Sequence, residues 1–119
     1  MAFVRVASLG AVRSRQARGR GVCVVVEGIE IGLFGVGADV HAMENTCPHA
    51  DAPLSEGDIE GPVVTCPLHA WQLDVRTGLR PSDPDGFPLA CFAVRVRGDD
   101  VEVDLDRVLN RRPRRGGAG

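Results

Sequence analysis

The feature that most constrains this chain is a pair of short cysteine and histidine groups within the stretch CPHADAPLSEGDIEGPVVTCPLHAW, residues 47–71. The first group is Cys47-x-His49 and the second is Cys66-x-x-His69. Each group pairs a thiol with an imidazole, and both side chains are common ligands of transition metals. If the four side chains share a metal, the fold has to bring these two separate loops together.

The segments around the two groups predict an all-β fold. Valine-rich and alternating segments are separated by turn residues, and the chain contains 15 glycines and 8 prolines. This pattern is typical of short strands joined by turns. The polar segment 14–20 and the proline-rich segment 81–88 are expected to be loops. We expect strands at residues 3–7, 22–26, 31–36, 40–44, 63–65, 71–74, 90–96 and 101–105, with a turn around Thr77-Gly78 that brings Leu79 back against 71–74.

The length of 119 residues fits one domain, which we expect to span residues 1–106. Residues 107–119 should form a disordered basic tail, because NRRPRRGGAG has no apolar side chain larger than alanine. No segment approaches the roughly 20 apolar residues of a membrane helix, and MAFVRVASLG lacks the continuous apolar core that is expected of a secretory signal. We therefore expect a cytoplasmic protein that does not bind membranes and whose four cysteines are reduced, which favours a metal site over disulfides.

The charges are unevenly distributed along the chain. All 14 basic residues are arginine, and none lies between Arg20 and Arg76, a stretch that carries nine carboxylates. This acidic stretch is either an ordinary solvated surface or a docking face for a basic partner. Nucleic-acid binding is not expected, because the net charge is -2 and aromatic residues are few.

The order of the ligands bears on the identity of the metal. A zinc finger takes two cysteines from one segment and two histidines from another, whereas each group here supplies one of each. In both groups the cysteine comes first, where a strand is expected to end, and the histidine lies farther out. Two such loops side by side would pair thiols at one depth and imidazoles at another, which suits a binuclear iron cluster. Zinc stays open as the alternative.

With this motif the chain resembles the Rieske iron-sulfur family, from the opening strand to about Asp106. The resemblance implies an antiparallel β-sandwich of short strands with two cluster-binding loops, and one Rieske-type [2Fe-2S] cluster. It also implies that Cys47 and Cys66 bind the inner iron and that His49 and His69 bind the outer iron.

The function implied by the resemblance is that of a ferredoxin. Such a protein carries electrons from a flavin-dependent NAD(P)H reductase to a terminal oxygenase of the ring-hydroxylating type, and is not itself an enzyme. We expect no catalytic residues and a monomer. Three alternatives remain: the small electron-transfer subunit of an NAD(P)H-dependent nitrite reductase, a zinc-stapled structural or interaction module, and a redox or iron sensor in which loss of the cluster is the signal.

The neighbours of the ligands predict a low reduction potential. High-potential members of the family carry an extra cysteine in each loop and use serine and tyrosine hydroxyls as donors to the cluster sulfurs. The segments 50–53 and 70–72 contain neither cysteine nor serine, and the chain has no tyrosine. We therefore expect a value near the low end of the range of roughly -150 to +300 mV.

Four other residues are expected to have structural roles. Cys23 and Cys91 fall in expected strands and should be small buried thiols. His41 should have a structural or surface role, and Trp71 should pack in the core or against a loop.

Overall fold

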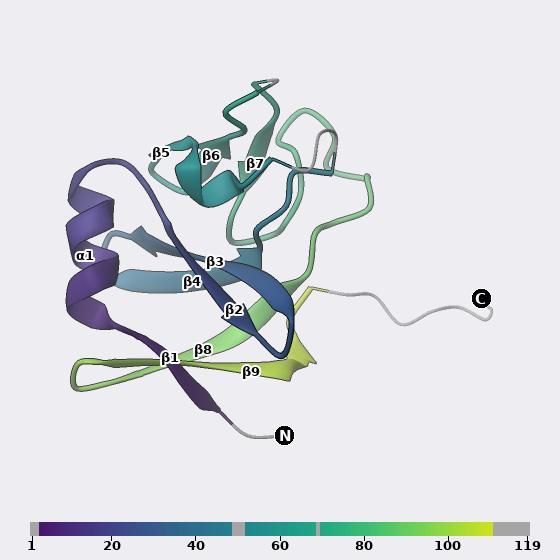
Figure 1. Ribbon diagram of the computed structural model, residues 1–119. Helices are drawn as coiled ribbons and strands as arrows, with labels where there is room; N and C mark the ends of the chain where they lie inside the picture. Colours follow the sequence, from purple (N-terminus) through teal and green to yellow (C-terminus); the bar gives the residue numbers. More distant parts are fainter. Residues whose placement is uncertain (1–2, 49–51, 69, 111–119) are drawn as a thin grey trace.

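The computed structural model describes residues 3–48, 52–68 and 70–110, which form two antiparallel sheets and one α-helix (Figure 1). The larger sheet has six strands in the order β1-β9-β8-β4-β3-β2, and the smaller has three in the order β5-β6-β7. The outer strands β1 and β2 approach each other, so the six-stranded sheet curls almost into a barrel. The all-β prediction is therefore confirmed, with one helix added.

The six-stranded sheet contains most of the strands expected from the sequence. Its strands are β1 (Val4–Ser8), β2 (Val22–Val26), β3 (Ile29–Val36), β4 (Asp39–Glu44), β8 (Cys91–Arg97) and β9 (Asp100–Val108). The strands expected at 90–96 and 101–105 are confirmed as β8 and β9, which pair as an antiparallel hairpin. Strand β9 extends two residues beyond the expected domain boundary at 106.

The chain continues in contact with the fold as far as Asn110. Its side-chain amide donates to the carbonyl oxygens of Thr77 and Leu89, both at 2.7 Å, and accepts from the Cys91 backbone N–H at 3.0 Å. The tail expected to be disordered lies, from residue 111 onward, outside the described residues.

The prediction of a loop at residues 14–20 is wrong for residues 14–17, because these residues belong to the helix α1, which spans Leu9–Ala17. The Ser8 hydroxyl caps the helix by accepting from Ala11 N at 3.1 Å. A second cap comes from the β8–β9 turn, where the Asp99 carboxylate accepts from Gly10 N at 3.0 Å. A donor and acceptor 89 positions apart cannot be paired from local sequence, which is why the helix was missed. No helix in the described part of the chain is long and apolar enough to cross a membrane.

The smaller sheet is inserted between β4 and β8 and stands above the six-stranded sheet (Figure 1). It consists of β5 (Asp58–Glu60), β6 (Val63–Thr65) and β7 (Gln72–Asp74), and follows a short 3-10 helix, η1 (Leu54–Glu56). Strands β6 and β7 match the predictions, while β5 and η1 were not expected. Leu79 lies back against β7 as expected, because its carbonyl oxygen accepts a hydrogen bond from Asp74 N at 2.9 Å. It does not belong to a strand. The proline-rich loop at residues 81–88 contains no strand, as expected.

Buried side chains form two groups that meet at β3 and β4. One group fills the curled six-stranded sheet, and the other fills the space between the two sheets. Phe34 of β3 belongs to the second group and is fully buried. Its ring lies so close to Gly21 and Gly32 that a β-carbon at either position would come within 2.6 Å of it. Glycine at these positions leaves the room that the buried Phe34 ring occupies.

Candidate metal centre

Cys47 lies three residues after β4, in the first loop of the motif. Its backbone N–H donates to the carbonyl oxygen of Ala52 at 2.8 Å, and Thr46 pairs with Pro53 in an isolated antiparallel bridge. These contacts close the loop on itself. The Cys47 side chain is fully buried at the base of the loop.

Cys66 occupies the corresponding place in the second loop, directly after β6. Its backbone N–H donates to the carbonyl oxygen of Trp71 at 2.7 Å, and its own carbonyl accepts from Ala70 N at 3.1 Å. In both loops the cysteine N–H therefore bonds to the carbonyl five positions farther on. Cys66 is only 2% exposed. The prediction that each group begins where a strand ends is confirmed.

The two loops bring both thiols into the same buried group between the sheets. Cys47 and Cys66 are members of this group together with Leu54, Val64 and Leu73, and neither forms a disulfide. Two buried thiols in apolar surroundings suit the pair of thiolates that holds the inner iron of a Rieske-type site. The donor set described by the structure therefore fits that half of the cluster.

The other two expected ligands, His49 and His69, lie outside the described residues, as do residues 50 and 51. Their part in the site stays a prediction.

A buried amide holds the first loop in place. Asn45 is fully buried and donates from Nδ2 to Ser55 Oγ at 3.0 Å, while its Oδ1 accepts from Ser55 N at 2.8 Å. The Asn45 carbonyl accepts from Leu54 N at 2.8 Å. Sequence reasoning missed this pair. The available signal in the sequence was an asparagine two positions before Cys47, an expected ligand. Its partner Ser55 lies ten positions away and is found only in three dimensions.

A glycine sets the approach of the first loop to the second. A β-carbon on Gly57 would lie 1.9 Å from the carbonyl oxygen of Thr65, the residue that precedes Cys66. Since a contact this short with a backbone atom cannot be relieved by a side-chain rotation, only glycine fits without moving one of the loops. Gly57 therefore helps to fix how the two cysteine-bearing segments sit against each other.

Trp71 packs against the buried group and supports the second loop, as predicted. The guanidinium of Arg80 stacks over its ring, with Cζ 3.7 Å from the ring centroid. Arg80 Nε is buried and has no hydrogen-bond partner among the described residues, so the ring is its main neighbour.

The structure separates the two cysteines that are not expected to be ligands. Cys91 is buried as predicted, and burial, with smaller effects from the Asp74 and Glu44 carboxylates, raises the pKa of its thiol to about 12. The prediction that Cys23 is buried is wrong, because Cys23 is exposed. It lies on the edge strand β2, where Val22 and Val24 pack against the buried group inside the six-stranded sheet and the alternate residues, Cys23 and Val25, are exposed.

His41 lies on β4 and is half-buried, in agreement with a structural role. Burial lowers its pKa below the ordinary value of 6.5, and the nearby Arg76 adds to this effect. The Asp39 and Asp74 carboxylates oppose it.

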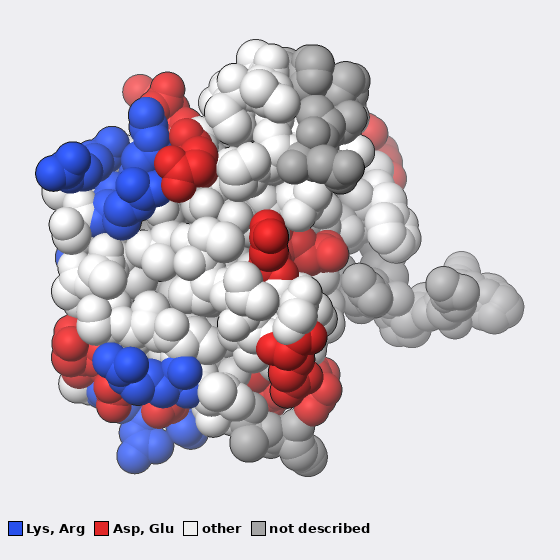
Figure 2. Space-filling model, viewed as in Figure 1, with Lys and Arg blue, Asp and Glu red and all other residues white. Residues whose placement is uncertain are grey.

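Arginines that flank the acidic stretch pair with several of its carboxylates. Arg15 bonds to Glu56 at 2.9 Å, Arg20 pairs with Asp58, and Arg76 bonds to Asp74 at 2.8 Å. In Figure 2 blue and red side chains lie together at the upper left, while the upper lobe is mostly uncharged where its residues are described. The docking role of the acidic stretch stays a prediction.

Comparison with known proteins places this arrangement in a family. Residues 4–93 match the model of the Rieske [2Fe-2S] domain, and the chain belongs to that family. The family carries one Rieske-type [2Fe-2S] cluster, which is therefore the cofactor of this chain. The alternative of a zinc site is set aside.

Among curated relatives, the biphenyl 2,3-dioxygenase ferredoxin component of Rhodococcus jostii (strain RHA1) is 48% identical over 74 residues, covering 62% of this chain and 69% of the relative. The ferredoxin component of the naphthalene 1,2-dioxygenase system of Pseudomonas aeruginosa is 37% identical over 82 residues, covering 69% and 79%.

Solved structures give the same result. The ferredoxin of carbazole 1,9a-dioxygenase from Nocardioides aromaticivorans IC177 matches with a TM-score of 0.74 and 32% identity, over 87% of this chain and 97% of that chain. A chain in the complex of reduced oxygenase and oxidized ferredoxin in carbazole 1,9a-dioxygenase matches with a TM-score of 0.73 and 29% identity, over 94% and 97%.

Proposed function

We propose that this protein is a one-electron carrier of the ferredoxin type, which passes electrons from a flavin-dependent NAD(P)H reductase to a terminal ring-hydroxylating oxygenase. The observation that carries the proposal is that the described fold matches 97% of a dioxygenase ferredoxin chain with a TM-score of 0.74. The curated relatives named above are also dioxygenase ferredoxins, which favours this role over that of a nitrite reductase subunit.

The proposed ligands are Cys47 and Cys66 for one iron, and His49 and His69 for the other. The two buried thiols support the first pair, and the motif spacing supports the second. When bound, the cluster supplies a centre that accepts and releases one electron. The contribution of the chain is to orient both thiols through the matched backbone hydrogen bonds of Cys47 and Cys66, and to keep water from them with the apolar group between the sheets.

We also propose that the protein acts as a cytoplasmic monomer with a low potential. Cysteines that serve as thiolate ligands suit a reducing compartment. Residues 50–53 and 70–72 contain no serine and the chain contains no tyrosine, so the serine and tyrosine hydroxyls that high-potential members use as donors to the cluster sulfurs are missing.

The reduction potential of the bound cluster tests the proposal that this is a low-potential protein. Voltammetry of the purified holoprotein should give a value below zero, near the low end of the roughly -150 to +300 mV range. A value well above zero would contradict it. Replacing His49 or His69 by cysteine should lower the potential further, if a cluster assembles, because a thiolate adds negative charge.

The ligand assignment is tested by single substitutions. Cys47→Ser and Cys66→Ser should each lose most of the bound iron and acid-labile sulfide, while the matched control Cys23→Ser should keep both. Electron transfer is tested by reducing the holoprotein with NADH and a flavin reductase under anaerobic conditions, and then adding an oxygenase component. A holoprotein that contains the cluster but transfers no electron to the oxygenase would refute the carrier role.

A further inference from the structure

Two apolar side chains near the cysteine loops are more exposed than any other large apolar side chain in the described part of the chain. Phe87, in the proline-rich loop, is 90% exposed, and Leu68, two residues after Cys66, is 67% exposed. A phenylalanine left almost entirely in water contributes nothing to the core. Large apolar side chains left exposed beside a functional site are candidate contacts for a partner.

Phe87 lies beside the first cysteine loop. It lines a hollow of about 220 Å³ together with Pro48, Trp71 and Leu89. Pro48 directly follows Cys47, and the carbonyl of Trp71 accepts the backbone hydrogen bond of Cys66. In Figure 1 the loop that carries Phe87 is the green segment that runs beside the upper sheet. The exposed ring is therefore part of the surface that an electron-transfer partner has to approach.

The loop that presents Phe87 is already held in shape. Asp83 N donates to the Arg80 carbonyl at 2.9 Å, Gly86 N to the Asp83 carbonyl at 3.1 Å, and Leu89 N to the Gly78 carbonyl at 2.9 Å. Prolines at 81, 84 and 88 fix further backbone angles. A preformed loop loses little conformational entropy when it binds, so a single exposed ring on it can contribute strongly to affinity.

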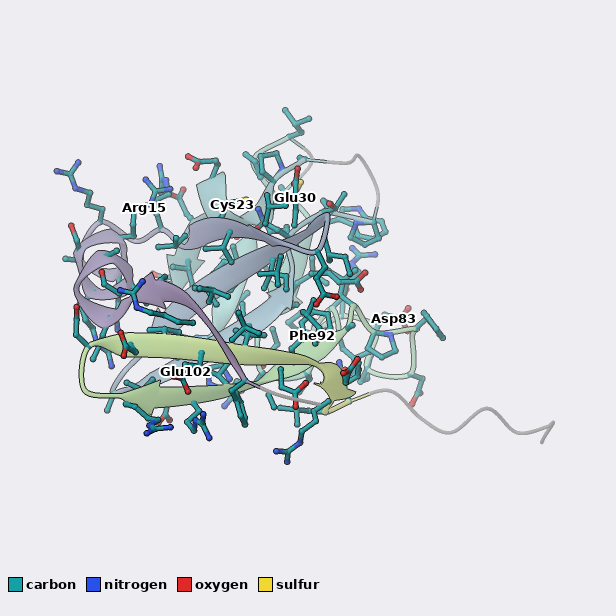
Figure 3. All side chains as sticks on the ribbon, turned by 60° about the horizontal axis from the view of Figure 1, so that its bottom comes forward. Arg15, Cys23, Glu30, Asp83, Phe92 and Glu102 are labelled. Atoms are coloured by element: carbon teal, nitrogen blue, oxygen red, sulfur yellow. The ribbon has the colours of Figure 1, made fainter. Side chains whose placement is uncertain are left out.

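The charges on this loop indicate the chemistry of the partner. Asp83 and Asp85 are exposed on either side of Pro84, while the one basic residue of the segment, Arg80, is stacked on Trp71. Figure 3 shows Asp83 at the far side of the molecule from Arg15 of α1, where arginines pair with the carboxylates of η1 and β5. The surface around Phe87 is thus apolar with an acidic border.

We propose that Phe87 is the main contact through which this protein docks on its terminal oxygenase, with its ring entering an apolar recess that is bordered by basic side chains. Leu68 makes a second apolar contact from the other loop. The inference rests on the proposed function. An oxygenase is chosen as the partner because the fold matches a ferredoxin-family chain that was solved in complex with one.

The test compares Phe87→Ser with Val25→Ser, a matched apolar-to-hydroxyl change at a 65% exposed position on the edge strand β2, away from the cysteine loops. The reduced holoprotein is mixed anaerobically with the oxygenase component of the biphenyl 2,3-dioxygenase of Rhodococcus jostii, and reoxidation is followed over a range of oxygenase concentrations. Phe87→Ser should raise the half-saturating concentration about tenfold, as expected for a central aromatic contact, with the limiting rate unchanged. Val25→Ser should match the unmodified protein.

Further measurements distinguish a loss of docking from a loss of folding and from a failure of the proposed function. Both variants should keep the visible spectrum, the potential and the melting temperature, and Phe87→Leu should recover part of the affinity. The proposal would be overturned if Phe87→Ser and the unmodified protein had the same half-saturating oxygenase concentration. It would also be overturned if the substitution changed only the rate at which the reductase reduces the protein. If the unmodified protein fails to reduce the oxygenase at all, the proposed function fails, and the docking inference falls with it.

Discussion

Individual side chains determine how closely the two cysteine loops approach. Asn45 and Ser55 close the first loop through two buried hydrogen bonds, and Gly57 leaves room for the Thr65 carbonyl of the second. None of the three is an expected ligand. The geometry of the site therefore depends on residues whose importance is visible only from their partners.

Gly57→Ala should destabilise the protein by about 1–3 kcal/mol, because a β-carbon 1.9 Å from a backbone oxygen forces the loops apart. Denaturant unfolding monitored by circular dichroism gives the free energy, and the visible spectrum reports on the cluster. The control is Gly10→Ala in α1, where the nearest atom is 3.8 Å away, and which should stabilise by roughly 0.5–1 kcal/mol. A stable Gly57→Ala variant with an unchanged spectrum would contradict this account.

The lowered pKa of His41 predicts that the stability of the protein depends on pH. Its pKa in the folded protein is lowered by burial, so the folded state binds the proton less readily than the unfolded chain. The stabilisation is complete above the ordinary pKa of 6.5 and is lost as the pH falls below that value towards the folded pKa. We expect the free energy of unfolding to decrease between about pH 7 and pH 5.

His41→Gln removes the titrating group and should flatten this decrease. Comparing the two holoproteins at each pH isolates His41 from the acidic groups and from the cluster. Parallel curves for the two proteins would show that His41 does not contribute.

Among the secondary-structure elements, the β2–β3 hairpin follows directly from local turn chemistry. Val26 pairs with Ile29, so the turn has two central residues, Glu27 and Gly28, with φ of 52° and 80°. Positive φ at both positions defines the turn type that favours Asn-Gly. Gly28 suits its place, whereas Glu27 is strained there because a β-carbon disfavours this region.

Glu27→Asn should therefore stabilise the protein by up to about 1 kcal/mol, since asparagine adopts positive φ more readily. Glu27→Gln is the matched control, because it removes the same charge without the conformational preference. Thermal unfolding of both variants checks the prediction. An equal gain in the two would assign the effect to charge.

Helix α1 is the opposite case, because contacts with residues far away in the sequence determine that this segment is helical. The side chain of Gln16 lies against Gly35 of β3, and Arg13 donates to the carbonyl oxygens of Gly37 and Ala38 at 2.9 and 2.6 Å. Together with the cap from Asp99, these contacts stabilise a short polar helix with one buried side chain, Val12. Short isolated helices are marginal in water, so a polar segment becomes helical only when such contacts are available.

At the scale of the whole molecule, two surface features bear on partner docking. They are the ion pairs near the upper sheet, and the apolar surface around Phe87 with its acidic border. Charges that are already paired within the chain contribute less to a long-range field. Apolar contact through Phe87 should therefore persist at high salt, because hydrophobic burial is not screened.

This predicts how electron transfer depends on ionic strength. Between about 0.05 and 0.5 M salt, the association rate with the oxygenase should fall modestly, and the roughly tenfold effect of Phe87→Ser should remain. Stopped-flow reoxidation at both salt concentrations measures the two quantities. A fall of several orders of magnitude with salt would instead favour docking by the acidic stretch as a whole.

The residues of this chain by themselves indicate its family and most of its strands. The spacing from Cys47 to His69 identifies the loops, alternation identifies β8 and β9, and a glycine marks the β2–β3 turn. These features depend on neighbours a few positions apart, because strand alternation and turn conformation are set by local backbone geometry.

Only the tertiary structure decided the rest. It decided that residues 9–17 form a helix, that Cys91 is buried while Cys23 is exposed, and that Phe87 projects beside the cysteine loops. Each of these depends on which strand lies at an edge or which turn packs on another. Such contacts join residues far apart in the chain, and their energies come from burial and hydrogen bonding between them, which local sequence does not encode.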